Sequence, residues 1–133
     1  MNEKRILLVD DEPMVLRVLR LQLEKRGFDV ETAPNGRAAL EIVLATPPDA
    51  MVTDIEMPHM TGEELCKSLQ EQLPDRSFPI FVVTSLTSLR HREWSAAMKD
   101  LHFLEKPLSA KKLIEVLKGY FEAEQQTDSE EIV

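Results

Sequence analysis

Short apolar runs alternate with amphipathic stretches along the whole chain. The runs rich in β-branched residues predict five strands, at residues 6–9, 28–32, 49–54, 80–83 and 101–104. The stretches between and after them have the apolar spacing of helices, at residues 14–25, 37–45, 62–73, 88–98 (the weakest pattern) and 110–122. Strands and helices therefore alternate five times, at about the repeat length that builds a parallel sheet.

Turn and capping residues fall between these segments. Pro13 favours a first helical turn, and Asn35 precedes a glycine where it can cap the second helix. Thr61 and Glu64 have the spacing of a capping box, and Ser109 is expected to cap the last helix. The turn and capping residues thus agree with the hydrophobic pattern on where the helices begin.

The predicted fold is α/β, a doubly wound five-stranded parallel sheet with helices on both faces. The run at residues 49–54 does not alternate, as expected of a central strand that is covered on both faces. A strand order of 2-1-3-4-5, one of the two common orders, places the switch point between the first and third strands. We expect one domain over residues 1–122 and an acidic, flexible tail over residues 123–133.

Charge and composition narrow the class of function. The net charge of −8 disfavours a direct nucleic-acid partner and suits a protein that binds a cation or a basic protein surface. No apolar run has membrane-spanning length, and the first residues lack the apolar core of a secretory signal. With a single cysteine, Cys66, the chain is expected to be cytoplasmic.

Polar residues follow four of the predicted strands at the point where each ends. They are Asp10 and Asp11, Asp54, Thr84 and Lys106. Since parallel strands end at one edge of the sheet, we expect these side chains to converge there. Crowded carboxylates repel, which raises their pKa values unless a cation neutralises them. The oxygen donors suit Mg²⁺, with Mn²⁺ as a substitute.

Such a cluster has a definite chemistry. Asp54 would act as a nucleophile towards a phosphoryl group, and the product would be an acyl phosphate on the protein itself. Lys106 would offer a positive charge to one phosphoryl oxygen, and the Thr84 hydroxyl would donate to another.

Each residue also has a simpler interpretation. Asp10 or Asp11 could cap the first helix, and Asp54 could be a solvated acid at a strand end. Thr84 could serve only as a β-former. The presence of all these residues at matching strand ends favours the site.

The motifs together resemble the receiver domain of two-component response regulators, such as chemotaxis receivers, over about residues 4–121. The matching pieces are Leu-Val-Asp-Asp-Glu-Pro, Val-Thr-Asp-Ile-Glu-Met-Pro with Gly62 after it, Val-Val-Thr-Ser and Phe-Leu-Glu-Lys-Pro-Leu. The resemblance implies a flavodoxin-like fold. It also implies a phosphoacceptor that phosphorylates and dephosphorylates itself only slowly, and so is not an enzyme in the ordinary sense.

The resemblance implies further roles for named residues. Asp54 would receive phosphate from a histidine kinase or phosphotransfer protein, and the main-chain carbonyl of Glu56 would complete the Mg²⁺ ligands with Asp10 or Asp11. The Lys106-Pro107 peptide bond would be cis. Thr84 and Phe103 would move on phosphorylation. This movement would alter the surface of the fourth helix, fifth strand and fifth helix, which would bind a downstream protein or a second copy.

Two positions depart from the family pattern. Lys99-Asp100 stands where small residues, often Gly-Ala, precede the fifth strand, and Ser85 follows Thr84 in place of alanine. We expect the first change to reshape the output surface and the second to make the groove over Asp54 slightly more polar. Neither removes a residue of the site.

Two rival functions remain open. An aspartyl-phosphate phosphatase typically has Asp-x-Asp after the first strand, whereas this chain has Asp10-Asp11-Glu12. A docking module would bind its partner whether or not Asp54 is phosphorylated. Since the chain has no residues for an output domain, we expect output through a partner unless this is one piece of a longer protein.

The remaining chemistry-bearing residues have simpler roles. His59, His91 and His102 lack metal-type spacing and are expected at the surface or in packing. Cys66 is expected to be a small residue on the third helix. Trp94 could be a core residue or an exposed anchor for a partner.

Overall fold

Five parallel strands form one sheet in the computed structural model, which describes residues 3–85 and 93–132 and, for side chains, none beyond residue 124. The strands are β1 (Arg5–Val9), β2 (Asp29–Ala33), β3 (Ala50–Asp54), β4 (Ile80–Thr84) and β5 (Leu101–Glu105). Their order is β2-β1-β3-β4-β5, so the predicted fold class and strand order are confirmed.

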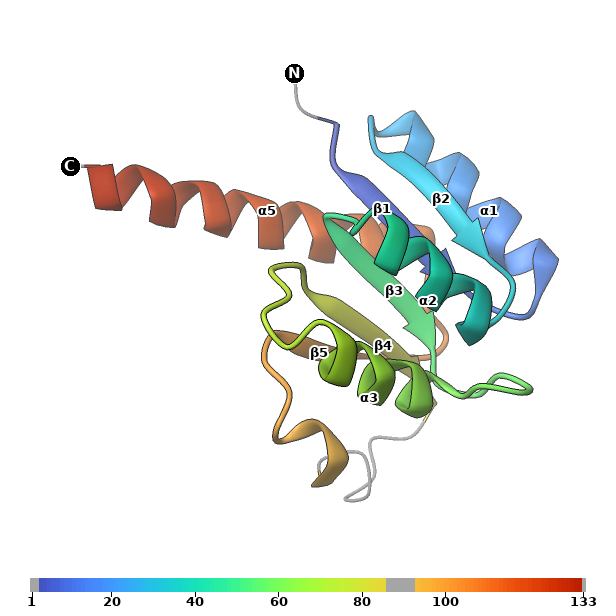
Figure 1. Ribbon diagram of the computed structural model, residues 1–133. Helices are drawn as coiled ribbons and strands as arrows, with labels where there is room; N and C mark the ends of the chain where they lie inside the picture. Colours follow the sequence, from blue (N-terminus) through green and yellow to red (C-terminus); the bar gives the residue numbers. More distant parts are fainter. Residues whose placement is uncertain (1–2, 86–92, 133) are drawn as a thin grey trace.

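Helices cover both faces of this sheet (Figure 1). One face carries α1 (Pro13–Lys25) and α5 (Ala110–Ile132), and the other carries α2 (Gly36–Ala45) and α3 (Gly62–Gln72). Helices on both faces of a parallel sheet are what a doubly wound fold requires.

Helices α2, α3 and α5 begin with side-chain caps, whereas α1 begins at Pro13 without one. The Asn35 side chain accepts a hydrogen bond from the main-chain N–H of Ala38 at 2.8 Å. Thr61 and Glu64 form the predicted capping box, in which each side chain accepts from the other residue's main-chain N–H. Ser109 accepts from the N–H of Lys112 at 3.0 Å.

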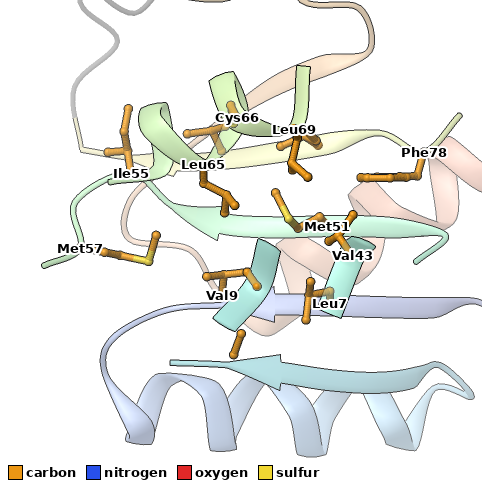
Figure 2. Packing of buried hydrophobic residues seen from close by; sticks show 14 residues of the cluster. Leu7, Val9, Val43, Met51, Ile55, Met57, Leu65, Cys66, Leu69 and Phe78 are labelled. Atoms are coloured by element: carbon orange, nitrogen blue, oxygen red, sulfur yellow. The ribbon is translucent and has the colours of Figure 1, made fainter. Parts of the chain in front are cut away.

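Two apolar clusters lie on the two faces of the sheet. One fills the space under α2 and α3, where side chains from both helices meet those of β1 and β3 (Figure 2). The other lies under α1 and α5. Strand β3 contributes to both, because Met51 faces the first cluster and Val52 the second, and all five of its residues are buried. The central strand is thus fixed from both sides.

Two segments differ from the prediction. Of the helix expected at residues 88–98, the part before residue 93 lies outside the described residues, and only residues 93–95 are helical in the part that is described. Helix α5 continues to Ile132, through the stretch for which composition predicted a tail. Glu, Ala and Gln are good helix formers, so the helix propagates past Phe121, the last buried residue of α5 among those whose side chains are described. No helix in the described part of the chain is both long and apolar enough to span a membrane.

Gly62 begins α3 directly against the end of β3. Its N–H donates to the main-chain oxygen of Ile55 at 2.9 Å. A Cβ at this position would lie 2.5 Å from the main-chain oxygen of Asp54 and 2.8 Å from the Cα of Ile55. Both neighbours are backbone atoms, so only glycine allows α3 to approach the end of this strand so closely.

Gly62→Ala should therefore lower the free energy of unfolding by roughly 1–3 kcal/mol, because the added methyl group forces backbone apart. Gly119→Ala is the matched control. Gly119 lies within α5 with no atom within 4 Å of a built Cβ, so alanine there should be neutral or stabilise by up to about 1 kcal/mol. Urea denaturation of the two variants measures both effects. Equal effects would contradict the close packing at Gly62.

Candidate functional site

The polar residues at the strand ends meet at one edge of the sheet. Pairing sets Thr53 beside Val9 and Asp54 beside Val83, and Thr84 beside Glu105. The residues that follow β1 and β4 therefore lie next to the end of β3, and those that follow β5 lie one strand further along the same edge. Of the residues predicted to converge, the structure brings Asp10, Asp54 and Lys106 around one cavity.

Asp54 and Lys106 form the central contact. The Nζ atom of Lys106 lies 3.0 Å from Oδ1 and 3.1 Å from Oδ2 of Asp54. The carboxylate is 5% exposed, whereas the lysine side chain is 37% exposed. Burial acts to lower the pKa of Lys106, but the hydrogen bond and negative charge of Asp54 outweigh burial and raise it. Lys106 is therefore held as a cation against a buried acid.

Asp10, Asp11 and Glu12 form an acidic cluster beside this pair. Their carboxylate oxygens lie within 4.8 Å of one another. Burial raises the pKa of Asp10, a hydrogen bond from the Glu12 N–H lowers it, and the charges of Asp54, Glu12 and Asp11 raise it further. The net result is a raised pKa, to which burial contributes most and the neighbouring carboxylates add.

The donor set of this cluster fits a hard divalent cation. Within the described residues, this is the one group of three or more acidic, histidine or cysteine side chains close enough to share a metal ion. All its donors are carboxylate oxygens, which suit Mg²⁺ better than zinc. The sequence motifs do not mark Glu12 as part of this group. Only its position immediately after Asp10-Asp11 indicates that it lies beside them.

The loop after β3 also contacts the acid. The main-chain N–H of Glu56 donates to Oδ1 of Asp54 at 3.3 Å. The metal-binding role predicted for the Glu56 carbonyl stays a prediction. The structure thus ties the loop to the carboxylate that it follows in sequence.

Thr84 and Lys106 are joined through their backbones. Thr84 is buried at the end of β4, and its main-chain oxygen accepts a hydrogen bond from the Lys106 N–H at 2.9 Å. Ser85, which follows, is exposed. The Lys106-Pro107 peptide bond is cis, which confirms the prediction. Thr84 therefore lies at the same edge as the lysine.

A cavity of about 400 Å³ opens beside these groups. Its polar lining comes from Asp10, Glu12, Asp54 and Lys106. The rest is apolar: Leu8, Val9, Val15, Leu16, Leu19, Val52, Val83, Pro107 and Leu108. A phosphoryl group is far smaller than this volume, so it can enter and contact the carboxylate of Asp54.

Phe103 lies away from the acids, on β5. Its ring meets that of Trp94 edge to face, with centroids 6.0 Å apart. Both side chains are half-buried and pack against the apolar cluster under α2 and α3. Trp94, for which the sequence allowed two roles, therefore packs against the core.

The cysteine and the histidines, which the sequence did not assign to the site, are placed as follows. Cys66 is fully buried on α3, and burial raises the pKa of its thiol to about 12. His59 is exposed, and His102 stacks on Phe81 with centroids 5.1 Å apart. His91 lies outside the described residues.

Comparison with known proteins shows which family the chain belongs to. The family model described as the response regulator receiver domain matches residues 6–118. The response regulator MprA of Mycolicibacterium vanbaalenii is 36% identical over 110 residues, which is 83% of this chain and 47% of that protein. MprA of Mycobacterium leprae is 34% identical over 97% of this chain and 56% of its own length. The chain thus spans about half the length of these curated relatives.

Solved structures agree in fold. The chemotaxis protein CheY4 of Vibrio cholerae superposes with a TM-score of 0.79 and 30% identity, covering 88% of this chain and 98% of CheY4. A CheY-like receiver domain protein from Methanospirillum hungatei gives a TM-score of 0.82 and 28% identity, covering 95% of this chain and 99% of the other. This chain belongs to the receiver-domain family of two-component response regulators.

Proposed function

We propose that Asp54 accepts a phosphoryl group from a histidine kinase or a phosphotransfer protein, and that the resulting acyl phosphate changes the surface that binds a partner. The observation that carries the proposal is the contact of Lys106 with both oxygens of Asp54, beside the acidic cluster. A buried acid, a fixed cation and neighbouring metal ligands are the parts that phosphoryl transfer needs.

The transfer step balances simply. An oxygen of Asp54 attacks the phosphorus of the donor's phosphohistidine, the P–N bond breaks, and the imidazole leaves as a neutral ring after taking up a proton. The charge of the phosphoryl group stays on its three oxygens. Lys106 then moves from the carboxylate to one of these oxygens, which its 37% exposed side chain permits. The Thr84 hydroxyl donates to another.

The acidic cluster has its own role in this proposal. Asp10 or Asp11, with Asp54 and the main-chain carbonyl of Glu56, would hold Mg²⁺, and Mn²⁺ could replace it. When bound, the cation supplies charge neutralisation for the crowded carboxylates and the phosphoryl oxygens. Glu12 adds a further carboxylate at the same place.

The switch is proposed to pass through β5. When Thr84 moves towards the phosphate, Phe103 turns inward and leaves its edge-to-face contact with Trp94. Phosphate then biases an equilibrium between two arrangements of the chain. The surface around β5 and α5 is where we place a downstream protein or a second copy.

The net charge of the chain indicates which class of partner it binds. A net charge of −8 favours a protein partner over direct contact with nucleic acid, and we place the chain in the cytoplasm, where histidine kinases deliver their phosphate. The activity of any longer protein that contains this domain is part of the same proposal.

Phosphorylation of Asp54 can be tested directly. After incubation with acetyl phosphate and Mg²⁺, the wild-type chain should gain the mass of one phosphoryl group, and Asp54→Asn should gain none. Lys106→Ala should slow the reaction roughly tenfold or more, because it removes a cation from the developing charge. Asp29→Asn, an exposed acid on β2, is the control and should react like wild type.

An unmodified wild type, or an undiminished adduct on Asp54→Asn, would contradict the assignment. Equal partner affinity with and without the adduct would instead favour a docking module. Repeated turnover of a phosphate ester would favour the phosphatase alternative.

Asp10→Asn tests the crowded acids. A raised pKa means that folding strengthens proton binding by Asp10, so its contribution to stability is present below its ordinary pKa of 3.8 and is lost as pH rises through the raised value. At pH 7 the ionised form of Asp10 therefore lowers the free energy of unfolding of the wild type. The variant has no charge at this position, so it should be more stable than the wild type when no metal is added. The amide can still accept the hydrogen bond from the Glu12 N–H.

The response to metal should be opposite. At Mg²⁺ concentrations near 100 times Kd, the wild type should gain about 2.7 kcal/mol, and Asp10→Asn much less. Urea denaturation at pH 7 with Mg²⁺ or with EDTA measures both differences, with Asp29→Asn again as control. A metal-free variant less stable than wild type would contradict the repulsion argued for this cluster.

A further inference from the structure

Lys99 and Asp100 form the turn that leads into β5. Asp100 has a backbone φ of +51°, in the left-handed region that an aspartate tolerates better than most residues. Its main-chain oxygen accepts a hydrogen bond from the Ile80 N–H at 3.0 Å. The turn is therefore fixed to the start of β4 as well as to its own strand.

The side chain of Asp100 joins two more elements. Oδ2 accepts a hydrogen bond from the Tyr120 hydroxyl of α5 at 2.5 Å, and Oδ1 lies 2.7 Å from Nε2 of His102 on β5. The Tyr120 and His102 rings also contact each other, with centroids 6.1 Å apart, and both contact Phe81. One carboxylate thus ties the turn to β5 and α5.

Arg76 holds the same turn from the α3–β4 loop. Its Nη2 donates to the main-chain oxygen of Lys99, and the whole residue is 5% exposed. Its Nε and Nη1 atoms are buried without a hydrogen-bond partner in the described part of the chain. Burying a charge with unsatisfied donors costs stability. The guanidinium also lies over the Phe78 ring, with its central carbon 5.8 Å from the ring centroid, which offsets part of this cost. Arg76 thus positions the turn from a buried site.

The anchored turn lies between the two rings that the switch must separate. Trp94 precedes the turn, and Phe103 follows it on the face of the sheet opposite to His102. If Phe103 turns inward, its edge-to-face contact with the Trp94 ring is lost, and the turn is the segment that still joins residues 93–98 to β5. Contacts that fix the turn from other elements resist any displacement of these two segments that accompanies the switch.

We propose that the contacts of Asp100 with Tyr120 and of Arg76 with Lys99 form a lock, which disfavours the phosphorylated arrangement. The inference rests on the proposed function, since it concerns the same switch. A phosphate can shift the equilibrium only by its differential affinity for the two arrangements. A contact made only in the resting arrangement raises the apparent Kd for phosphate and its analogues, and loss of that contact lowers it.

Tyr120→Phe tests the lock with little other change. The variant loses the hydroxyl but keeps the ring that contacts Phe81, His102 and Phe121. The full chain is titrated with beryllofluoride in Mg²⁺, and the fluorescence of Trp94, the single tryptophan, reports binding. The apparent Kd for beryllofluoride should fall about three- to tenfold, which matches the net contribution of one ordinary hydrogen bond.

A second variant and a control complete the test. Asp100→Asn tolerates the left-handed backbone but removes the charge, and it should lower the apparent Kd in the same direction. In the double variant the two effects should not add, because they act through one contact. Glu63→Gln removes a charge from the 2.8 Å ion pair with Lys67 on α3 and should leave the apparent Kd within about twofold of wild type.

The outcomes separate the lock from the proposed function. If Tyr120→Phe and Asp100→Asn lower the melting temperature but bind beryllofluoride like wild type, the contacts only stabilise the fold and the lock is wrong. In that case the adduct on Asp54 from acetyl phosphate still forms. If the wild type forms no such adduct, the proposed function and the lock fail together.

Discussion

The ion pair between Lys106 and Asp54 is the interaction on which the site depends. Its two residues are 52 positions apart in the sequence, and only the parallel arrangement of β3, β4 and β5 brings them within 3.0–3.1 Å. A buried carboxylate without a cation would be protonated or would destabilise the fold. Lys106 places a positive charge against this buried carboxylate and contacts both of its oxygens.

The fold makes this contact by fixing β3 from both sides. Its side chains enter both apolar clusters, so the strand cannot slide or rotate without breaking the core. Gly62 lets α3 press against the strand just where Asp54 leaves it. The acidic cluster that follows the neighbouring β1 is then held close to Asp54, and the repulsion among these carboxylates persists in the folded protein because the core holds them there. The stability of the core therefore offsets the electrostatic strain of the site.

Patterns local in the sequence were the ones that could be predicted. The caps at Asn35 and Thr61 follow from spacing, and both are confirmed. The strand order was chosen as one of the two common orders for such a sheet, and the cis bond before Pro107 follows from family motifs; both are confirmed. The predicted end of α5 was wrong, because composition alone does not show whether a polar helix continues beyond its packed part. The contact between Asp100 and Tyr120 joins residues 20 positions apart on different elements, and no local pattern reveals it.

A crystal structure of the chain with Mg²⁺ and beryllofluoride would show whether Asp54, Lys106 and the acidic cluster bind an acyl phosphate together. Beryllium should be bonded to a carboxylate oxygen of Asp54 and Mg²⁺ to Asp10 or Asp11, and the Lys106 ammonium should have turned from the carboxylate to a fluorine. Beryllofluoride bound elsewhere, or a Lys106 side chain directed away from the acyl phosphate analogue, would contradict it.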